Sequence, residues 1–240
     1  MSDDRIYKKI YSQVGKISER EVWRYAGYMG VPDSSQDELK SVFDEVVSEL
    51  DGAFSYQVCY RRLPLEWEMD DSTGAISPKL PFSYTSDSLN KCLAGSDEII
   101  IFAATIGPAI DKKILLYEKT AATKALIAQA YGAERVEALC DTFCEEIRVQ
   151  LKDEGKIMTP RFSPGYGDWS LEVQKEYFTV LDIYHQIGVS LGDSLLMRPS
   201  KSVTAIFGIK TGGAEECVDE HTAGEKCSMC SKEDCVYRKL

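Results

Sequence analysis

Basic residues and histidine are scarce in this chain of 240 residues. It has 28 lysines and arginines against 39 aspartates and glutamates, a net charge of -11, and only 2 histidines. Binding to phosphate backbones requires clustered Lys and Arg, and no basic stripe occurs along the chain. The sequence therefore argues against a surface that binds nucleic acid or an anionic membrane.

Long hydrophobic runs are also missing. The longest, such as Ile99 to Ile106, is far short of the roughly 20 apolar residues that a membrane-spanning helix needs. The first residues lack the positively charged segment and apolar run of a secretory signal, so we expect a cytoplasmic protein. In that compartment the 8 cysteines indicate thiols or metal ligands rather than a disulfide framework.

The common catalytic signatures are absent too. There is no Gly-x-Ser-x-Gly, no Walker loop and no dinucleotide fingerprint, and we find no internal repeat or low-complexity segment. The composition, 44% hydrophobic and 28% charged, is ordinary for a globular protein of one or two domains with a buried core. His185 fits a core or surface position rather than a catalytic one.

Apolar periodicity predicts alternating helices and strands. A short helix is expected from Ser18 to near Gly27 or Gly30, and a second from 35 to 50, where Ser35 to Glu38 form a capping box. Helical periodicity continues over 107–151, with Gly132 as a possible break, and over 170–187, where a turn at Gly188 follows. Strands are expected at 54–62, 98–105 and 203–209, with a short one near Leu191. Pro64, Pro78 and Pro81 favour an irregular connection. This pattern predicts an α+β fold with an antiparallel or mixed twisted sheet flanked by helices.

The most informative segment is the loop Arg161-Phe-Ser-Pro-Gly-Tyr-Gly-Asp168. Pro164 fixes one backbone angle, and Gly165 and Gly167 permit left-handed or close-approach geometry. The turn would thus hold Arg161 and Tyr166 in set positions, which suits a small charged ligand. An ordinary loop between helices remains the alternative, because Pro-Gly mainly marks a turn.

Three features of this region resemble one known family. Arg161-x-Ser-Pro-Gly-Tyr166, the helix before it, and Met197-x-Pro-x-x-Ser202-Val after it are similar to the S-adenosylmethionine-binding activation domain of cobalamin-dependent methionine synthase. The likeness is to the free-standing form of that domain and runs from about Ser18 to about Ile209. It implies an activation domain over 1–211, which includes an N-terminal helical segment. Gly212-Gly213 then separates the last expected strand from a Cys-rich tail over 212–240, which is absent from the fused form of the family.

The resemblance also implies a ligand site. Its glutamate, in the helix before the loop, matches Glu137 within one helical turn, with Glu134, Glu145 and Glu146 as rivals. Arg161 would form a bidentate pair with the ligand carboxylate, which needs the planar fork of a guanidinium; a helix-end salt bridge is its other interpretation. The expected site residues are Glu137, Arg161, Ser163, Gly165 and Tyr166.

Ser163 would act through its main chain, where the family often carries alanine. Tyr166 would pack on the ligand or shield it, or simply fill the core. The implied reaction is methyl transfer from S-adenosylmethionine to the reduced cobalamin of a partner methionine synthase, after reduction by flavodoxin or ferredoxin. Cob(I)alamin is a strong nucleophile and the thioether a good leaving group, so the protein mainly aligns donor and acceptor, and we expect no catalytic side chain.

His221 lies in Asp219-x-His221-x-x-Gly224, which matches the lower-ligand signature of cobalamin-binding modules. That signature opens a nucleotide-type α/β module, and only 225–240 follow it here, far fewer residues than such a domain needs. We interpret the match as coincidence, and we expect the cobalamin to arrive on a separate protein.

The tail carries four thiols within a short span, including the pair Cys227-Ser-Met-Cys230. This spacing suits a tetrahedral thiolate site for zinc or an iron-sulfur cluster; a plain reduced tail is the alternative. The expected ligands are Cys217, Cys227, Cys230 and Cys235. The other four cysteines, Cys59, Cys92, Cys140 and Cys144, are expected to be small core residues.

Two further functions stay open at this point. The first is a metal-bearing electron-transfer or interaction module that serves another corrinoid methyltransferase, in which the tail would do the chemistry and the loop would be structural. The second is a regulatory sensor of S-adenosylmethionine that carries out no reaction. Substitution of Arg161 or Cys227 separates these alternatives.

Overall fold

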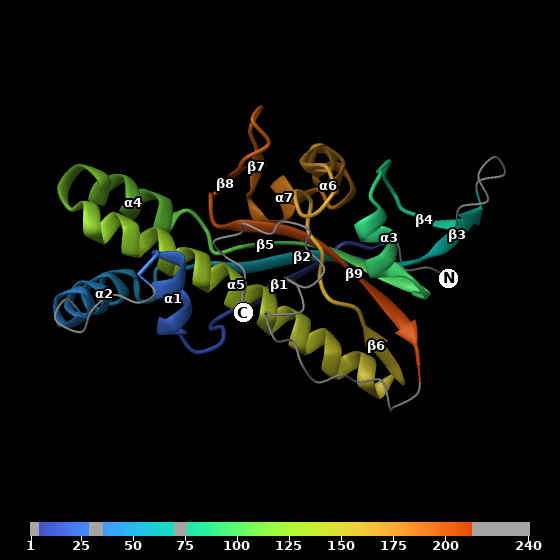
Figure 1. Ribbon diagram of the computed structural model, residues 1–240, viewed down its shortest axis with the longest axis horizontal. Helices are drawn as coiled ribbons and strands as arrows, with labels where there is room; N and C mark the ends of the chain where they lie inside the picture. The colour runs from blue at the N-terminus through green and yellow to red at the C-terminus, as the bar shows by residue number, and fades with distance from the viewer. Residues whose placement is uncertain (1–4, 29–35, 70–75, 213–240) are drawn as a thin grey trace.

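A five-stranded antiparallel sheet forms the centre of the protein (Figure 1). The computed structural model describes residues 5–28, 36–69 and 76–212, and the strand order in this sheet is β1-β2-β5-β9-β6. Every neighbouring pair is antiparallel, so the α+β prediction is confirmed and its sheet is of the antiparallel kind. The strands are β1 (Tyr7–Tyr11), β2 (Tyr56–Pro64), β5 (Glu98–Thr105), β9 (Ser202–Thr211) and β6 (Lys156–Met158).

Strand β5 separates two hydrophobic cores. Successive side chains of a strand point to opposite faces, so Ile100 and Phe102 enter one core while Ile99 and Ile101 enter the other. The neighbouring strand β9 divides its side chains in the same way. Both central strands are therefore buried on both faces, which explains their near-continuous apolar sequences.

Among the described residues, a group of four helices lies on the first face of the sheet, and α5 is the helix of this group that packs on the strands. The longest of them, α5, runs along the sheet and packs against the other three (Figure 1). Gly132 does not break α5, so that expectation was wrong. A Cβ there would lie 2.9 Å from Cγ1 of Ile110, and the glycine instead lets two helices approach closely. The helices are α1 (Glu19–Tyr25), α2 (Gln36–Leu50), α4 (Ala109–Thr120) and α5 (Ala122–Asp153).

Shorter elements cover the second face (Figure 1). The single helix expected over 170–187 was wrong, because Asp182 has a left-handed backbone, with φ of 46°, and divides it. Gly188, with φ of 70°, ends the last helix as predicted. The elements are α3 (Asp87–Leu93), a 3-10 turn (Leu171–Val173), α6 (Gln174–Val180), α7 (Ile183–Ile187), and a hairpin of β7 (Ser190–Leu191) and β8 (Met197–Arg198).

The segment after β2 forms a two-stranded ribbon of β3 (Glu66–Met69) and β4 (Ile76–Lys79). The irregular connection expected there was wrong, because Pro78 pairs with Trp67 within the ribbon. Both strands of a two-stranded ribbon have an open edge, where the missing N–H of a proline is tolerated. Ser35, the cap expected for α2, lies outside the described residues. Among the helices of the described ranges, none is both long and apolar enough to cross a membrane.

Candidate functional site

Arg161 is fixed between the edge of the sheet and α5. Before it, the Thr159 N–H donates to the Gly208 carbonyl at 2.9 Å, and the Gly208 N–H donates to Oγ1 of Thr159 at 2.8 Å. After it, Phe162 and Ile206 exchange two main-chain hydrogen bonds of 2.8 Å. Because Thr159, two residues before Arg161, and Phe162, the residue after it, are both hydrogen-bonded to β9, the main chain at Arg161 has little freedom.

Two carboxylates of α5 meet the guanidinium. Glu137 and Asp141 are four residues apart and therefore lie on the same face of the helix. Nη2 of Arg161 donates to Oε2 of Glu137 at 2.6 Å and to Oδ1 of Asp141 at 2.8 Å. The structure thus brings together two of the predicted site residues. It adds Asp141, which the sequence pattern could have supplied as the next residue on that face.

The side chain of the arginine in this cluster is largely shielded from solvent. Its side chain is 9% exposed, whereas those of Glu137 and Asp141 are 38% and 72% exposed. Nη1 is buried and has no hydrogen-bond partner among the described residues. Burial opposes the charge of Arg161, but the field of Glu137, with a smaller contribution from Asp141, raises its pKa above the usual value. The guanidinium is therefore permanently charged and has donor capacity to spare.

The remaining neighbours of the cluster are weakly acidic groups that stay neutral. Cys140 is buried, and this burial raises the pKa of its thiol well above the usual range. Burial, aided by the charge of Glu137, raises the pKa of Tyr25 to about 12. Tyr25 ends α1, so this helix also contributes to the surroundings of Glu137. Neither group can act as a base near neutral pH.

The loop after Arg161 is closed by its own hydrogen bonds. The Gly165 N–H donates to the Trp169 carbonyl at 2.8 Å, and the Tyr166 N–H donates to the Ser163 carbonyl at 3.2 Å. Gly165 and Gly167 have φ of 91° and 55°, which L-residues rarely adopt. The Tyr166 side chain is 63% exposed at the tip, so the interpretation that it fills the core was wrong.

Asp168, the last residue of the motif, caps α3. Its carboxylate accepts hydrogen bonds from the Ser86 hydroxyl at 2.5 Å and from the main-chain N–H groups of Asp87 and Ser88 at 2.8 and 3.2 Å. The Ser86 hydrogen bond is the main cause that lowers the pKa of Asp168 to about 2. This carboxylate therefore holds the loop against α3, and its hydrogen bonds serve the fold rather than a ligand.

The three rival glutamates have other partners. Glu134 is buried and pairs with the adjacent Arg135, while its Oε1 also accepts the main-chain N–H of Ser18 at 3.0 Å. Glu145 pairs with Arg148, and Glu146 pairs with Lys9 and accepts from Tyr11. Glu137 is thus the one among these four glutamates that contacts Arg161.

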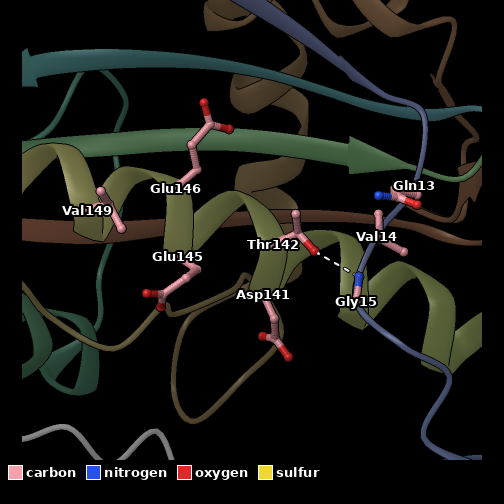
Figure 2. A pocket seen from close by; sticks show the side chains of 8 residues that line it. All are labelled: Gln13, Val14, Gly15, Asp141, Thr142, Glu145, Glu146 and Val149. Carbon is pink, nitrogen blue, oxygen red and sulfur yellow. Dashed lines mark hydrogen bonds between the residues drawn. The ribbon is translucent and has the colours of Figure 1, made fainter.

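An open groove of about 550 Å³ begins beside the cluster and follows α5 (Figure 2). Figure 2 shows Asp141 and Glu145 on one side of the helix and Glu146 on another, with a hydrogen bond from the Gly15 N–H to Oγ1 of Thr142. The groove is lined by Gln13, Val14, Gly15, Asp141, Thr142, Glu145, Glu146 and Val149.

The candidate metal ligands Cys217, Cys227, Cys230 and Cys235 lie outside the described residues, as does His221. Within the described ranges, no group of three His, Cys, Asp or Glu residues could hold a metal ion. The four cysteines that were expected in the core are buried, and none of these four forms a disulfide. His185 is a surface residue, 74% exposed, with its Nδ1 at 2.6 Å from Oδ1 of Asp182.

The fold and the site define an α+β domain in which Arg161, from a loop at the edge of the sheet, contacts the helix α5. No protein-family model matches the sequence, and a search of curated proteins also found no match.

A solved structure shares this fold, namely the crystal structure of the MetH reactivation domain bound to AdoHcy. The TM-score is 0.57 at 16% sequence identity, and the alignment covers 85% of this chain and 78% of that chain. A likeness at this identity establishes the fold. It is the fold that the sequence motif had indicated.

Proposed function

We propose that this chain binds S-adenosylmethionine at Arg161 and serves the reductive reactivation of a cobalamin-dependent methionine synthase. The ligand would present its methyl group to the reduced corrinoid carried by the partner synthase. Two independent findings support this: the sequence motif, and the shared fold of the MetH reactivation domain, which was crystallised with AdoHcy. The motif and the fold agree although the overall identity is only 16%.

The observation that carries the proposal is the buried, partly unused guanidinium. Nη1 of Arg161 is buried and has no partner among the described residues, and a buried donor without an acceptor costs about 1–3 kcal/mol. A ligand carboxylate would remove that cost and gain a charge-assisted, bidentate interaction. The amino-acid end of S-adenosylmethionine supplies such a carboxylate.

The charge of the site also suits this ligand. One guanidinium and two carboxylates, Glu137 and Asp141, give the cluster a net negative charge, so a simple anion would be repelled. S-adenosylmethionine carries an ammonium and a sulfonium besides its carboxylate and is cationic overall. Glu145 and Glu146 further along the groove favour the same kind of ligand.

The proposed methyl transfer needs no acid or base from the side chains of the site. Methyl transfer from a sulfonium needs alignment and exclusion of water rather than proton transfer. The neutral thiol of Cys140 and phenol of Tyr25 agree with this. The chain's own residues would therefore bind and orient the methyl donor, while the partner synthase supplies the acceptor.

Calorimetric titration with S-adenosylmethionine and S-adenosylhomocysteine tests the binding. We expect Arg161→Ala to weaken binding by about ten- to a hundred-fold, the equivalent of one charge-assisted hydrogen-bonded pair. Arg161→Lys should recover little, because an ammonium lacks the planar fork. Lys40→Ala, which removes exposed ion pairs with Glu19 and Asp44 outside the groove, is the control and should leave binding unchanged.

An anaerobic assay with the candidate synthase tests the reactivation. Recovery of synthase activity should require this chain, S-adenosylmethionine and a low-potential electron donor, and it should be lost in Arg161→Ala. Because Arg161 is buried, circular dichroism of each variant must first show a wild-type fold. Unchanged affinity in a folded Arg161→Ala protein would count against the proposal.

A further inference from the structure

The guanidinium of Arg161 is shared between two carboxylates of the chain itself. A terminal guanidinium nitrogen has two N–H groups, and Nη2 uses them on two carboxylates, Glu137 at 2.6 Å and Asp141 at 2.8 Å. Nη1 is the nitrogen without a partner among the described residues. A ligand carboxylate that binds across Nη1 and Nη2 needs one N–H from each nitrogen, so one of the two carboxylates must leave Nη2.

Exposure decides which carboxylate can leave. The Asp141 side chain is 72% exposed and that of Glu137 is 38% exposed. An ion pair with so exposed a partner contributes about 0–1 kcal/mol, because water solvates the released carboxylate almost as well. Releasing Glu137 would cost more, since it has less access to water.

The groove provides room for this exchange. Asp141 belongs to its lining and Glu137 does not, and Figure 2 shows Asp141 beside Glu145 on the same side of α5. Asp141 therefore contacts Arg161 and also lines the groove. Since Arg161 is not part of that lining, a ligand in the groove would meet Asp141 before it meets Arg161.

We propose that Asp141 is an internal competitor for Arg161: it pairs with the guanidinium and must be displaced by the carboxylate of a ligand that binds there. The inference rests on the proposed function, because it takes Arg161 as the carboxylate-binding residue. Asp141 then sets the affinity of the site: it lowers the affinity for ligands with a carboxylate and has no such effect on ligands that lack one.

Calorimetry with two probes tests this competition. S-adenosylhomocysteine has the amino-acid carboxylate, and 5′-methylthioadenosine has the same nucleoside and thioether without it. Asp141→Asn and Asp141→Ala should raise the affinity for S-adenosylhomocysteine about two- to five-fold, the range of a mostly exposed ion pair. The affinity for 5′-methylthioadenosine should stay the same. Because Asp141 is exposed, both variants should fold.

Glu145→Gln is the matched control. Glu145 lies one turn further on the same side of α5, is 60% exposed and pairs with Arg148, so this variant loses the same charge from the same groove. It should not raise the affinity for S-adenosylhomocysteine. A gain of equal size in Glu145→Gln would mean that general charge, and not competition, is responsible, and would overturn the inference.

The remaining outcomes are equally decisive. If the wild-type chain binds S-adenosylhomocysteine and neither Asp141 variant binds it more tightly, the competition is refuted and the proposed function stands. If the variants gain equally for 5′-methylthioadenosine, the effect does not act on the carboxylate and the inference again fails. If neither wild type nor variants bind S-adenosylhomocysteine, both proposals fall. Binding by the Asp141 variants alone would support strong competition.

Discussion

Gly208 is the place where one added methyl group should disturb both the fold and the site. It lies in β9, and a Cβ there would be 2.1 Å from Oγ and 2.9 Å from Cβ of Ser96, and 3.3 Å from Cδ2 of Leu93. Ser96 is buried, so it cannot swing into solvent. Gly208→Ala must therefore push β9 and the turn before β5 apart.

The magnitude follows from overpacking. Inserting a methyl group into a packed core typically costs about 1–3 kcal/mol, which for a chain of this size lowers the melting temperature by about 2–12 °C. Urea unfolding followed by tryptophan fluorescence measures the change. Gly212→Ala is the control: its Cβ would lie 3.6 Å from Cδ1 of Ile157, an ordinary contact, and it should change stability by less than about 0.5 kcal/mol.

A second substitution tests the cause. Ser96→Gly removes both clashing atoms and keeps the Ser96 carbonyl that accepts from the Trp67 indole, so the double variant should be more stable than Gly208→Ala alone. A Gly208→Ala protein as stable as the wild type, or one that Ser96→Gly fails to improve, would refute this reasoning. Because Gly208 bonds Thr159, two residues before Arg161, we also expect weaker binding of S-adenosylhomocysteine.

Two further predictions concern the motif loop. The pKa of Asp168, lowered to about 2 from about 3.9 in an unfolded chain, means that its carboxylate stabilises the fold above about pH 4 and loses this effect as the pH falls towards 2. Asp168→Asn should lower the free energy of unfolding by about 1 kcal/mol at pH 7, as the loss of other helix caps does. In thermal melts the difference in stability between variant and wild type should shrink between pH 4 and pH 2. A difference in stability that does not depend on pH would contradict this. Tyr166→Ala, at a side chain that is 63% exposed, should leave stability within about 0.5 kcal/mol but weaken S-adenosylhomocysteine binding about two- to ten-fold if the ring packs on the ligand. Calorimetry and thermal melts of the same variant measure the two effects. A loss of stability without a loss of affinity would mean that Tyr166 has a structural role and does not contact the ligand.

Local patterns were sufficient wherever neighbours in the chain decide the structure. The strand at 98–105 was predicted with the same bounds as β5. Its eight residues are mostly isoleucine, alanine and phenylalanine, and such a continuous apolar run is typical of a strand that is buried on both faces. The helical periodicity from 107 to 151 likewise indicated α4 and α5, and the glycines of the motif loop indicated a left-handed turn. The buried state of Cys140 followed from its place on an apolar helix face.

The rest was decided by contacts between distant segments. The edge strands β1 and β6 are short and gain their regularity from pairing with β2 and β9, which no local period reveals. Asp182 interrupts a periodic helix, although its sequence offers no breaker. The same holds for the site: the helical period places Glu137 and Asp141 on one face, yet it gives no information on which of the acidic residues of α5 meets Arg161. The partner of Arg161 is fixed by the packing of α5 on the sheet and by the hydrogen bonds of the 159–162 segment to β9. A helical period specifies which residues share a face, but only the tertiary fold specifies which residues of another segment contact that face.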